Sequence, residues 1–267
     1  MARRSSLSTL ELSLFPQPTS AQANQYWYVT QRPWPSLLFI LPGLLLFEIG
    51  TICHDGWDGR GNSQLVAPFL IERLVESLRT GDQTPQLLWM GPGLLLIAFL
   101  LAWHIAARHP WRFDGFVLAG MLGESLLHTI PLVVFGRLML QAARPGQNHA
   151  LWLDSVIRSF GAGIYEELVF RLICITVLVI LLIDLARLPR GPAGIFILAA
   201  SAVLFAYQHH PPLGAEPFAI QSFLFRSAAG LYLAGLFVFR GFGIAAGCHV
   251  FYNVIVVTMG AISHPGG

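Results

Sequence analysis

One long apolar segment, residues 155–184 (SVIRSFGAGIYEELVFRLICITVLVILLID), constrains the fold more than any other part of the chain. It is long enough to span a membrane, which takes about 20 mostly apolar residues. Glu166, Glu167 and Arg171 nevertheless lie inside it. Ionisable groups within a bilayer cost free energy unless they are paired or hydrated, so they usually mark a functional site. The segment therefore predicts a transmembrane helix that carries reactive groups.

The composition places the rest of the chain in the membrane as well. Of 267 residues, 55% are hydrophobic and only 11% are charged, whereas soluble domains have about 25% charged residues. We therefore predict an all-α, polytopic membrane helical bundle of about seven transmembrane helices. Besides the segment above, the apolar spans are expected at about 36–53, 87–106, 115–140, 195–209, 218–239 and 244–262.

The segments outside these spans predict a tail and loops around one domain. Residues 1–35 are polar and lack the apolar core of a cleavable signal peptide, so we expect a polar N-terminal tail. Residues 36–265 are expected to form a single transmembrane domain. In its longest loop, residues 65–79 alternate apolar and charged faces at helical spacing. This pattern favours an amphipathic helix at the membrane interface, with a packed connector helix as the alternative.

Charge and cysteine content argue against several other classes of protein. The net charge is only +2, and the 16 basic residues are spread along the chain, so no nucleic-acid partner is expected. Cys53, Cys174 and Cys248 lie in or beside apolar spans and form neither a disulfide framework nor a zinc pattern. All basic residues are arginine, which indicates a GC-rich genome. The expected location of the protein is the inner membrane of a bacterium. Their distribution favours a cytoplasmic N-terminus.

The first polar cluster is expected to divide into a pair and a free carboxylate. Glu167 and Arg171 are four residues apart, so on a helix they face the same way and can neutralise each other. Glu166 is rotated by about 100° from Glu167 around the helix axis and does not take part in that ion pair. A free carboxylate in a poorly solvated place is a strong base when ionised, as activation of water requires.

Polar residues recur in two later spans. His209 ends the fifth span, where it can bind water or donate a proton. His249 and Asn253 share a face of the last span, and together they can donate two hydrogen bonds to one oxygen, as an oxyanion site requires. Because the central and last helices should be antiparallel, Glu166 and His249 can meet only near mid-depth. A central helix that begins near residue 151 places Glu166 about 22 Å along it.

Two further acidic positions are interpreted as structural. Glu124 and His128 are four residues apart and are expected to form a hydrogen-bonded pair, with a supporting or gating role as the alternative. Glu48 lies near the end of the first span and is expected to be a carboxylate near the lipid headgroups.

Three motifs in this order resemble those of the CPBP family, which includes type II CAAX prenyl endopeptidases and bacteriocin-processing or abortive-infection proteins. EELVFR (166–171) is similar to its EExxxR motif, FAYQH (205–209) to its FxxxH motif and HVFYN (249–253) to its HxxxN motif. The resemblance covers about residues 150–260. It implies a glutamic-type intramembrane endopeptidase that needs no cofactor and cleaves a membrane-associated protein or peptide.

The resemblance also implies a role for each residue of the site. Glu166 and His209 would activate water, and His249 and Asn253 would stabilise the oxyanion. Glu167 and Arg171 would hold the site together. The sequence leaves two alternatives open. A metal-dependent hydrolase would use the Glu and His residues as zinc ligands. A non-enzymatic immunity factor, scaffold or transporter would keep the fold without needing Glu166, although no repeat typical of transporters is present.

Overall fold

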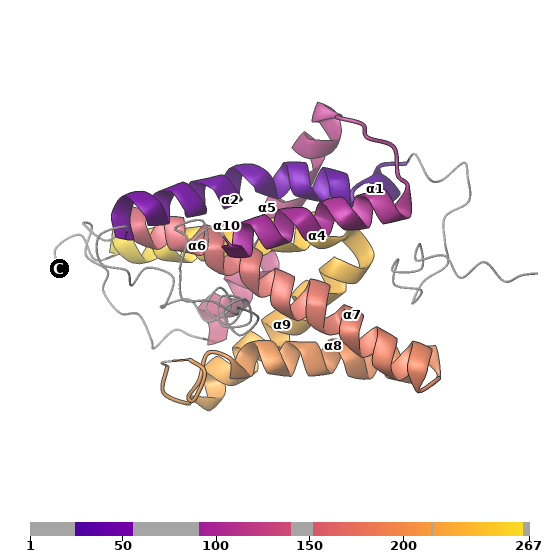
Figure 1. Ribbon diagram of the computed structural model, residues 1–267. Helices are drawn as coiled ribbons and strands as arrows, with labels where there is room; N and C mark the ends of the chain where they lie inside the picture. Colours follow the sequence, from indigo (N-terminus) through magenta and orange to yellow (C-terminus); the bar gives the residue numbers. More distant parts are fainter. Residues whose placement is uncertain (1–24, 56–90, 140–151, 215, 264–267) are drawn as a thin grey trace, which may run out of the picture.

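The computed structural model describes residues 25–55, 91–139, 152–214 and 216–263 of the chain. All regular secondary structure in these ranges is helical, and the helices pack as a bundle around a shared core (Figure 1). Among the described residues, six helical segments are long and apolar enough to cross a membrane, and a further apolar helix, Gly91–Ala107, is shorter. This arrangement confirms an all-α polytopic bundle, and the chain is an integral multi-pass membrane protein.

The predicted spans agree with the helices to within about five residues at each end. In chain order the helical segments are α1 (Tyr26–Val29), α2 (Pro33–Asp55), α4 (Gly91–Ala107), α5 (Gly115–Met139), α6 (Trp152–Glu167), η5 (Leu168–Ile175), α7 (Thr176–Val179), η6 (Ile180–Leu185), α8 (Arg190–Tyr207), α9 (Ile220–Arg240) and α10 (Phe242–Ser263). Because α8 ends at Tyr207, His209 follows the helix instead of ending it. The predicted interfacial helix, 65–79, lies outside the described residues. The proposed domain boundaries stay a prediction, with α1 and the start of α2 inside the expected tail.

The central segment is one long helix with two π-helical stretches. It runs through α6, η5, α7 and η6 for 34 residues, which at about 1.5 Å per residue is about 50 Å. A hydrocarbon core is about 30 Å thick, so this helix must tilt or project beyond it. The first π-helical stretch begins at Leu168, directly after the two glutamates. Such stretches occur frequently at functional sites because they change the direction of side chains within a helix.

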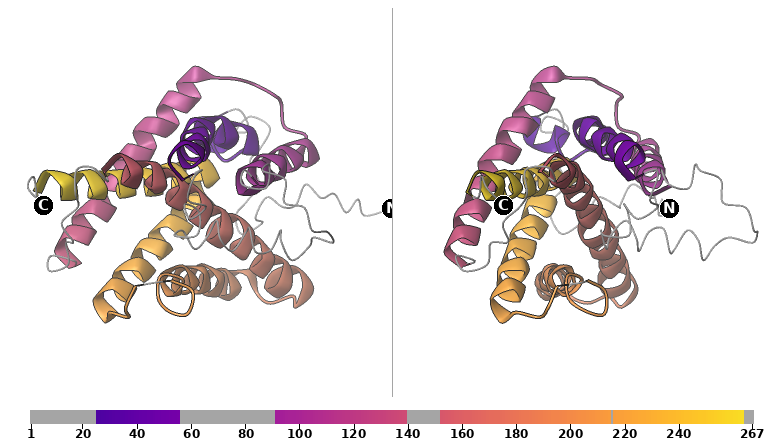
Figure 2. Two further views of the ribbon diagram at one scale, coloured as in Figure 1. Left: turned by 60° about the vertical axis from the view of Figure 1, so that its left-hand side comes forward. Right: turned by 90° about the vertical axis from the view of Figure 1, so that its left-hand side faces the viewer.

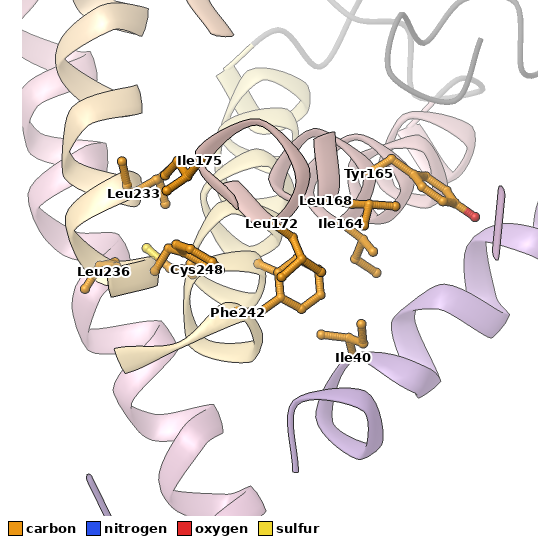
Figure 3. Close-up of a cluster of buried hydrophobic side chains, with 14 of the residues drawn as sticks. Ile40, Ile164, Tyr165, Leu168, Leu172, Ile175, Leu233, Leu236, Phe242 and Cys248 are labelled. Atoms are coloured by element: carbon orange, nitrogen blue, oxygen red, sulfur yellow. The ribbon is translucent and has the colours of Figure 1, made fainter. Parts of the chain in front are cut away.

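A buried apolar cluster joins this helix to its neighbours. Figure 3 shows Leu172 of η5 facing Phe242 of α10 and Ile40 of α2, with Leu233 of α9 beside Ile175. Cys248 lies in the same cluster and is a free thiol, as expected for a packing residue. The packed helices thus fix the positions of α6, α9 and α10 relative to one another.

A glycine lets α6 and α10 approach within backbone contact. A Cβ atom added to Gly163 would lie 2.7 Å from the backbone nitrogen of Val250, closer than van der Waals contact allows. Val250 is adjacent to His249, and Gly163 precedes Glu167 by one helical turn. The crossing at Gly163 therefore brings the glutamates and His249 to the same level along the two helices. Their side chains can then meet, as the sequence analysis required for residues on antiparallel helices. Figure 2 shows the helical bundle from two further directions.

The other acidic positions belong to structural contacts. Glu124 forms an ion pair with Arg240 and accepts a hydrogen bond from the Tyr26 hydroxyl at 2.8 Å. Its distance to His128 Nε2 is 3.5 Å, so the predicted pair forms, although Arg240 is the stronger partner. Glu48 is buried and accepts a hydrogen bond from the hydroxyl of Tyr165, so its expected place near lipid headgroups is wrong.

Candidate active site

Five of the six predicted site residues lie together where α6 passes into η5. Glu166 and Glu167 are the last two residues of α6. His209 Nε2 is 3.8 Å from Glu166 Oε1, and His249 Nε2 is 3.7 Å from Glu166 Oε2. Glu166 is buried and lies between two imidazole rings that come from different parts of the chain. The fifth residue, Arg171, lies on the far side of Glu167.

Glu167 and Arg171 form the fully buried ion pair that their spacing predicts. Arg171 Nε is 3.1 Å from Glu167 Oε2, and both side chains are 0% exposed. The guanidinium also donates a hydrogen bond to the Gly230 carbonyl at 3.1 Å and lies over the Phe205 ring, 4.4 Å from its centroid. Buried charges are tolerated when they are paired and hydrogen-bonded. This pair therefore fixes the carboxylate of Glu167 and ties η5 to α8 and α9.

The position of Glu167 determines which nitrogen of His249 carries a proton. His249 Nδ1 is 2.9 Å from Glu167 Oε1. Since Glu167 is paired with Arg171, its carboxylate only accepts, and Nδ1 must donate. A neutral His249 then presents a bare Nε2 toward Glu166. The ring can donate at Nε2 only when it is protonated on both nitrogens.

His209 is oriented in the same way by a backbone carbonyl. Its Nδ1 is 3.0 Å from the Phe205 carbonyl oxygen, which can only accept, so Nδ1 donates and Nε2 is free to accept. Burial, helped by the positive charge of Arg226, lowers the pKa of His209 to about 4. His209 is therefore neutral near pH 7, with the lone pair of Nε2 directed toward Glu166.

Phe205 is a site residue to which sequence reasoning gave no role of its own. Its ring packs edge-on against His209 and His249, with centroids 5.4 and 5.6 Å apart, and it supports the Arg171 guanidinium. One aromatic ring thus separates the two histidines and closes the apolar side of the cluster. The four-residue spacing of Phe205 and His209 was the signal that could have predicted this contact.

The segment that follows His209 is held by contacts that the sequence did not predict. The backbone nitrogen of Glu216 donates to the His209 carbonyl at 3.1 Å, and the Glu216 carboxylate pairs with Arg226 of α9 at 2.7 Å. His210 Nδ1 lies 3.2 Å from the Glu216 carbonyl, so His210 turns toward this segment, whereas His209 turns toward Glu166. Glu216 therefore links the position of His209 to α9.

Ser201 contacts the π-helical stretch that follows the two glutamates. The hydroxyl of Ser201 on α8 donates a hydrogen bond to the Phe170 carbonyl at 2.7 Å. Serine hydroxyls can satisfy backbone carbonyls that a local change in helix geometry leaves without an intrahelical partner. The contact helps to hold the irregular turn just after Glu167.

Asn253 lies one helical turn after His249 on α10 and is half-buried. This spacing places both residues on one face of the helix. Among the described residues, no group of three or more His, Cys, Asp and Glu side chains has an arrangement that could hold a metal ion. Both oxygens of Glu167 face other partners, His249 and Arg171, so Glu167 is poorly placed as a ligand.

These features define a multi-pass helical membrane protein in which carboxylates and imidazoles from three segments meet inside the bundle. Residues 148–255 match the family described as Type II CAAX prenyl endopeptidase Rce1-like. This segment, which holds the residues of the candidate site, is therefore similar to CAAX-type intramembrane endopeptidases. No curated protein and no solved structure matches the chain.

Proposed function

We propose that the protein is a glutamic-type intramembrane endopeptidase in which Glu166 and His209 activate a water molecule. The main support is the distance of 3.8 Å between Glu166 Oε1 and His209 Nε2. Both atoms are acceptors when Glu166 is ionised and His209 is neutral. They are too far apart for a direct hydrogen bond, and one water can donate to both at about 2.8 Å. A water held by two acceptors is oriented to lose a proton.

In the proposed reaction the water oxygen attacks the carbonyl carbon of the scissile peptide bond. One water proton passes to Glu166 or His209, and the carbonyl oxygen becomes an oxyanion. A doubly protonated His249 donates to this oxyanion from Nε2, together with the side-chain amide of Asn253. The C–N bond then breaks, and the stored proton passes to the leaving amine. The second water proton stays on the new carboxyl group, so the products are a carboxylic acid and an amine, and no external acid or base is consumed.

Charge balance supports the protonated form of His249 in this proposal. Glu166 and Glu167 contribute two negative charges, and Arg171 supplies one positive charge. A protonated His249, in contact with Glu167 and near Glu166, supplies the second. A neutral cluster costs less in a low-dielectric interior than one with a net charge. Glu167 and Arg171 act by positioning His249 and do not touch the substrate.

The proposed substrate is a membrane-associated protein or peptide that reaches the site from within the bilayer. No cofactor is required in this mechanism. The description of the matched family refers to prenylated CAAX proteins as substrates. If the protein lies in a bacterial inner membrane, other membrane-associated peptides are the expected substrates. The alternative is a metal-dependent hydrolase that uses the glutamates and histidines of the site as ligands, although their arrangement in the described residues forms no group that could hold a metal ion.

The test compares full-length wild-type protein with Glu166→Gln in detergent, using a library of membrane-anchored peptides and mass spectrometry of the products. Loss of a general base costs about 10² to 10⁴ in rate. Asp184→Asn is the matched control, because Asp184 is an exposed carboxylate on the same long helix. We expect cleavage that survives a strong zinc chelator, is lost in Glu166→Gln and persists in Asp184→Asn. Loss of cleavage in chelator would assign the metal-dependent mechanism. Equal cleavage by wild type and Glu166→Gln would overturn the proposed base, and no cleavage by folded wild type would favour a non-enzymatic protein.

A further inference from the structure

A cavity of about 360 Å³ lies apart from the catalytic cluster, at the ends of the two membrane-spanning helices α2 and α5. Its walls come from α1, the start of α2, the segment between α4 and α5, and the start of α5, which lie together at the upper right of Figure 1. Arg32 and Arg112 line it, together with Tyr26, Asp114 and Phe116. Helix ends of this kind lie at the depth of the lipid headgroups.

The charged side chains that line the cavity are two arginines, Arg32 and Arg112, and one carboxylate, Asp114. Asp114 opposes the two arginines, but its Oδ1 accepts hydrogen bonds from the backbone nitrogens of Phe116 and Val117 at 2.9 and 3.3 Å. Asp114 is therefore the N-cap of α5, and its charge is largely committed to that helix end. The guanidinium groups of Arg32 and Arg112 have the planar donor geometry that binds phosphate oxygens in pairs.

The rim of the cavity carries exposed aromatic side chains of the kind that lie at a membrane interface. Phe116 is 92% exposed, and Trp111 and Phe113 beside it are also exposed. Aromatic side chains at this depth commonly anchor a protein at the interface. Trp111 is itself held in place, because its ring packs against Trp34 and His104 with centroids 4.9 and 4.2 Å apart. The segment that carries Arg112 is thus packed against α2 and α4.

Six of the ten arginines among the described residues lie on the same side of the bundle. The helices alternate in direction, so the start of α2, the end of α4 and the turns between η6 and α8 and between α9 and α10 share this side. The arginines near these ends are Arg32, Arg108, Arg112, Arg187, Arg190 and Arg240. By the positive-inside rule this side is cytoplasmic, and cytoplasmic leaflets hold anionic lipids.

We propose that this cavity binds the phosphate group of an anionic phospholipid, held by Arg32 and Arg112. The acyl chains would lie along the exposed apolar residues of α5 below Phe116, which include Leu122 and Leu126. The site is independent of the proposed peptidase mechanism, because none of its residues takes part in the catalytic cluster.

The experiment measures lipid binding to the full-length protein by native mass spectrometry in detergent. Phosphatidylglycerol is titrated against phosphatidylcholine for wild type, for Arg32→Gln/Arg112→Gln and for Arg187→Gln/Arg190→Gln. The last variant is the matched control, because it removes two arginines from the same side of the bundle but outside the cavity. Thermal unfolding of each variant shows that it is folded, and inorganic phosphate is added as a competitor.

We expect wild type to prefer phosphatidylglycerol and Arg32→Gln/Arg112→Gln to bind it about 30-fold more weakly, since each arginine near an anionic surface contributes about 1 kcal/mol. The control should bind like wild type. An equal loss in both variants would show attraction by the whole face and would overturn the site. Equal affinity of wild type for the two lipids would also overturn it. Complete displacement of the lipid by inorganic phosphate would assign the site to the free anion instead.

Discussion

Replacing Arg171 by Met tests whether the buried ion pair holds the catalytic cluster together. Methionine keeps a long apolar side chain but removes the charge. Among the described residues, the substitution leaves the buried Glu167 carboxylate with His249 as its remaining ion-pair partner, and it removes the hydrogen bond to the Gly230 carbonyl. It also removes the contact of the guanidinium with the Phe205 ring at 4.4 Å.

The expected cost to the free energy of unfolding is about 3 to 5 kcal/mol, the range for removing one partner of a buried pair. The individual contacts give a similar value. A hydrogen bond to a charged group is worth about 1.5 to 3 kcal/mol, and a desolvated cation–π contact is worth about 2 kcal/mol. These contributions describe the same loss in part, so they are not added to the first range.

The assay is equilibrium unfolding in mixed micelles with increasing sodium dodecyl sulfate, followed by circular dichroism. Arg158→Met is the matched control, because Arg158 pairs with Asp154 at 2.9 Å, also four residues apart on α6, but both side chains are partly exposed. Exposed helical pairs contribute about 0.3 to 0.5 kcal/mol. If Arg171→Met costs no more than Arg158→Met, the buried pair does not stabilise the bundle. The double variant Arg171→Met/Glu167→Gln should recover part of the loss, because it removes the uncompensated charge.

Three further predictions concern the residues that position the catalytic cluster and the protonation of His209. Gly163→Ala should lower the free energy of unfolding by about 1 to 3 kcal/mol and should also reduce peptide cleavage, because the added Cβ would meet the backbone of Val250. Gly235→Ala is the control: its Cβ would meet nothing within 4 Å, so cleavage should be unchanged. Arg226→Glu should reduce cleavage about fivefold, because it breaks the partly exposed Arg226–Glu216 ion pair, which is worth about 1 kcal/mol. The charge-swapped variant Arg226→Glu/Glu216→Arg should restore cleavage. If it does not, Glu216 does not hold the segment that carries His209. Cleavage should fall as the pH is lowered toward 4, because His209, whose pKa burial lowers to about 4, then takes up a proton and can no longer accept one from water. Arg226→Gln removes a cation that lowers this pKa, so the acidic limb of the pH–rate profile should move to higher pH, and a shift to lower pH would contradict the assignment.

The sequence by itself determined the class of fold and the composition of the candidate site. Long apolar spans can satisfy their backbone groups in a bilayer only as helices, so the number and approximate limits of the spans followed from hydropathy. The pairing of Glu167 with Arg171 followed from their spacing on a single helix, which requires no knowledge of other helices. The motif resemblance added His209, His249 and Asn253 as candidates, and their catalytic roles stay a prediction.

The tertiary structure decided how these residues meet, because contacts between helices depend on packing that no local pattern encodes. The crossing at Gly163 and Val250 sets the level at which His249 reaches Glu167. The contact with Glu167 in turn fixes the proton on His249 Nδ1, so His249 can donate to an oxyanion from Nε2 only in its charged form. Glu216, Arg226 and Ser201 are distant in sequence from their partners and carry no motif, so only the folded chain identifies them. Side-chain spacing within one helix is set by local geometry, but the approach of two helices is set by the shapes of both surfaces together.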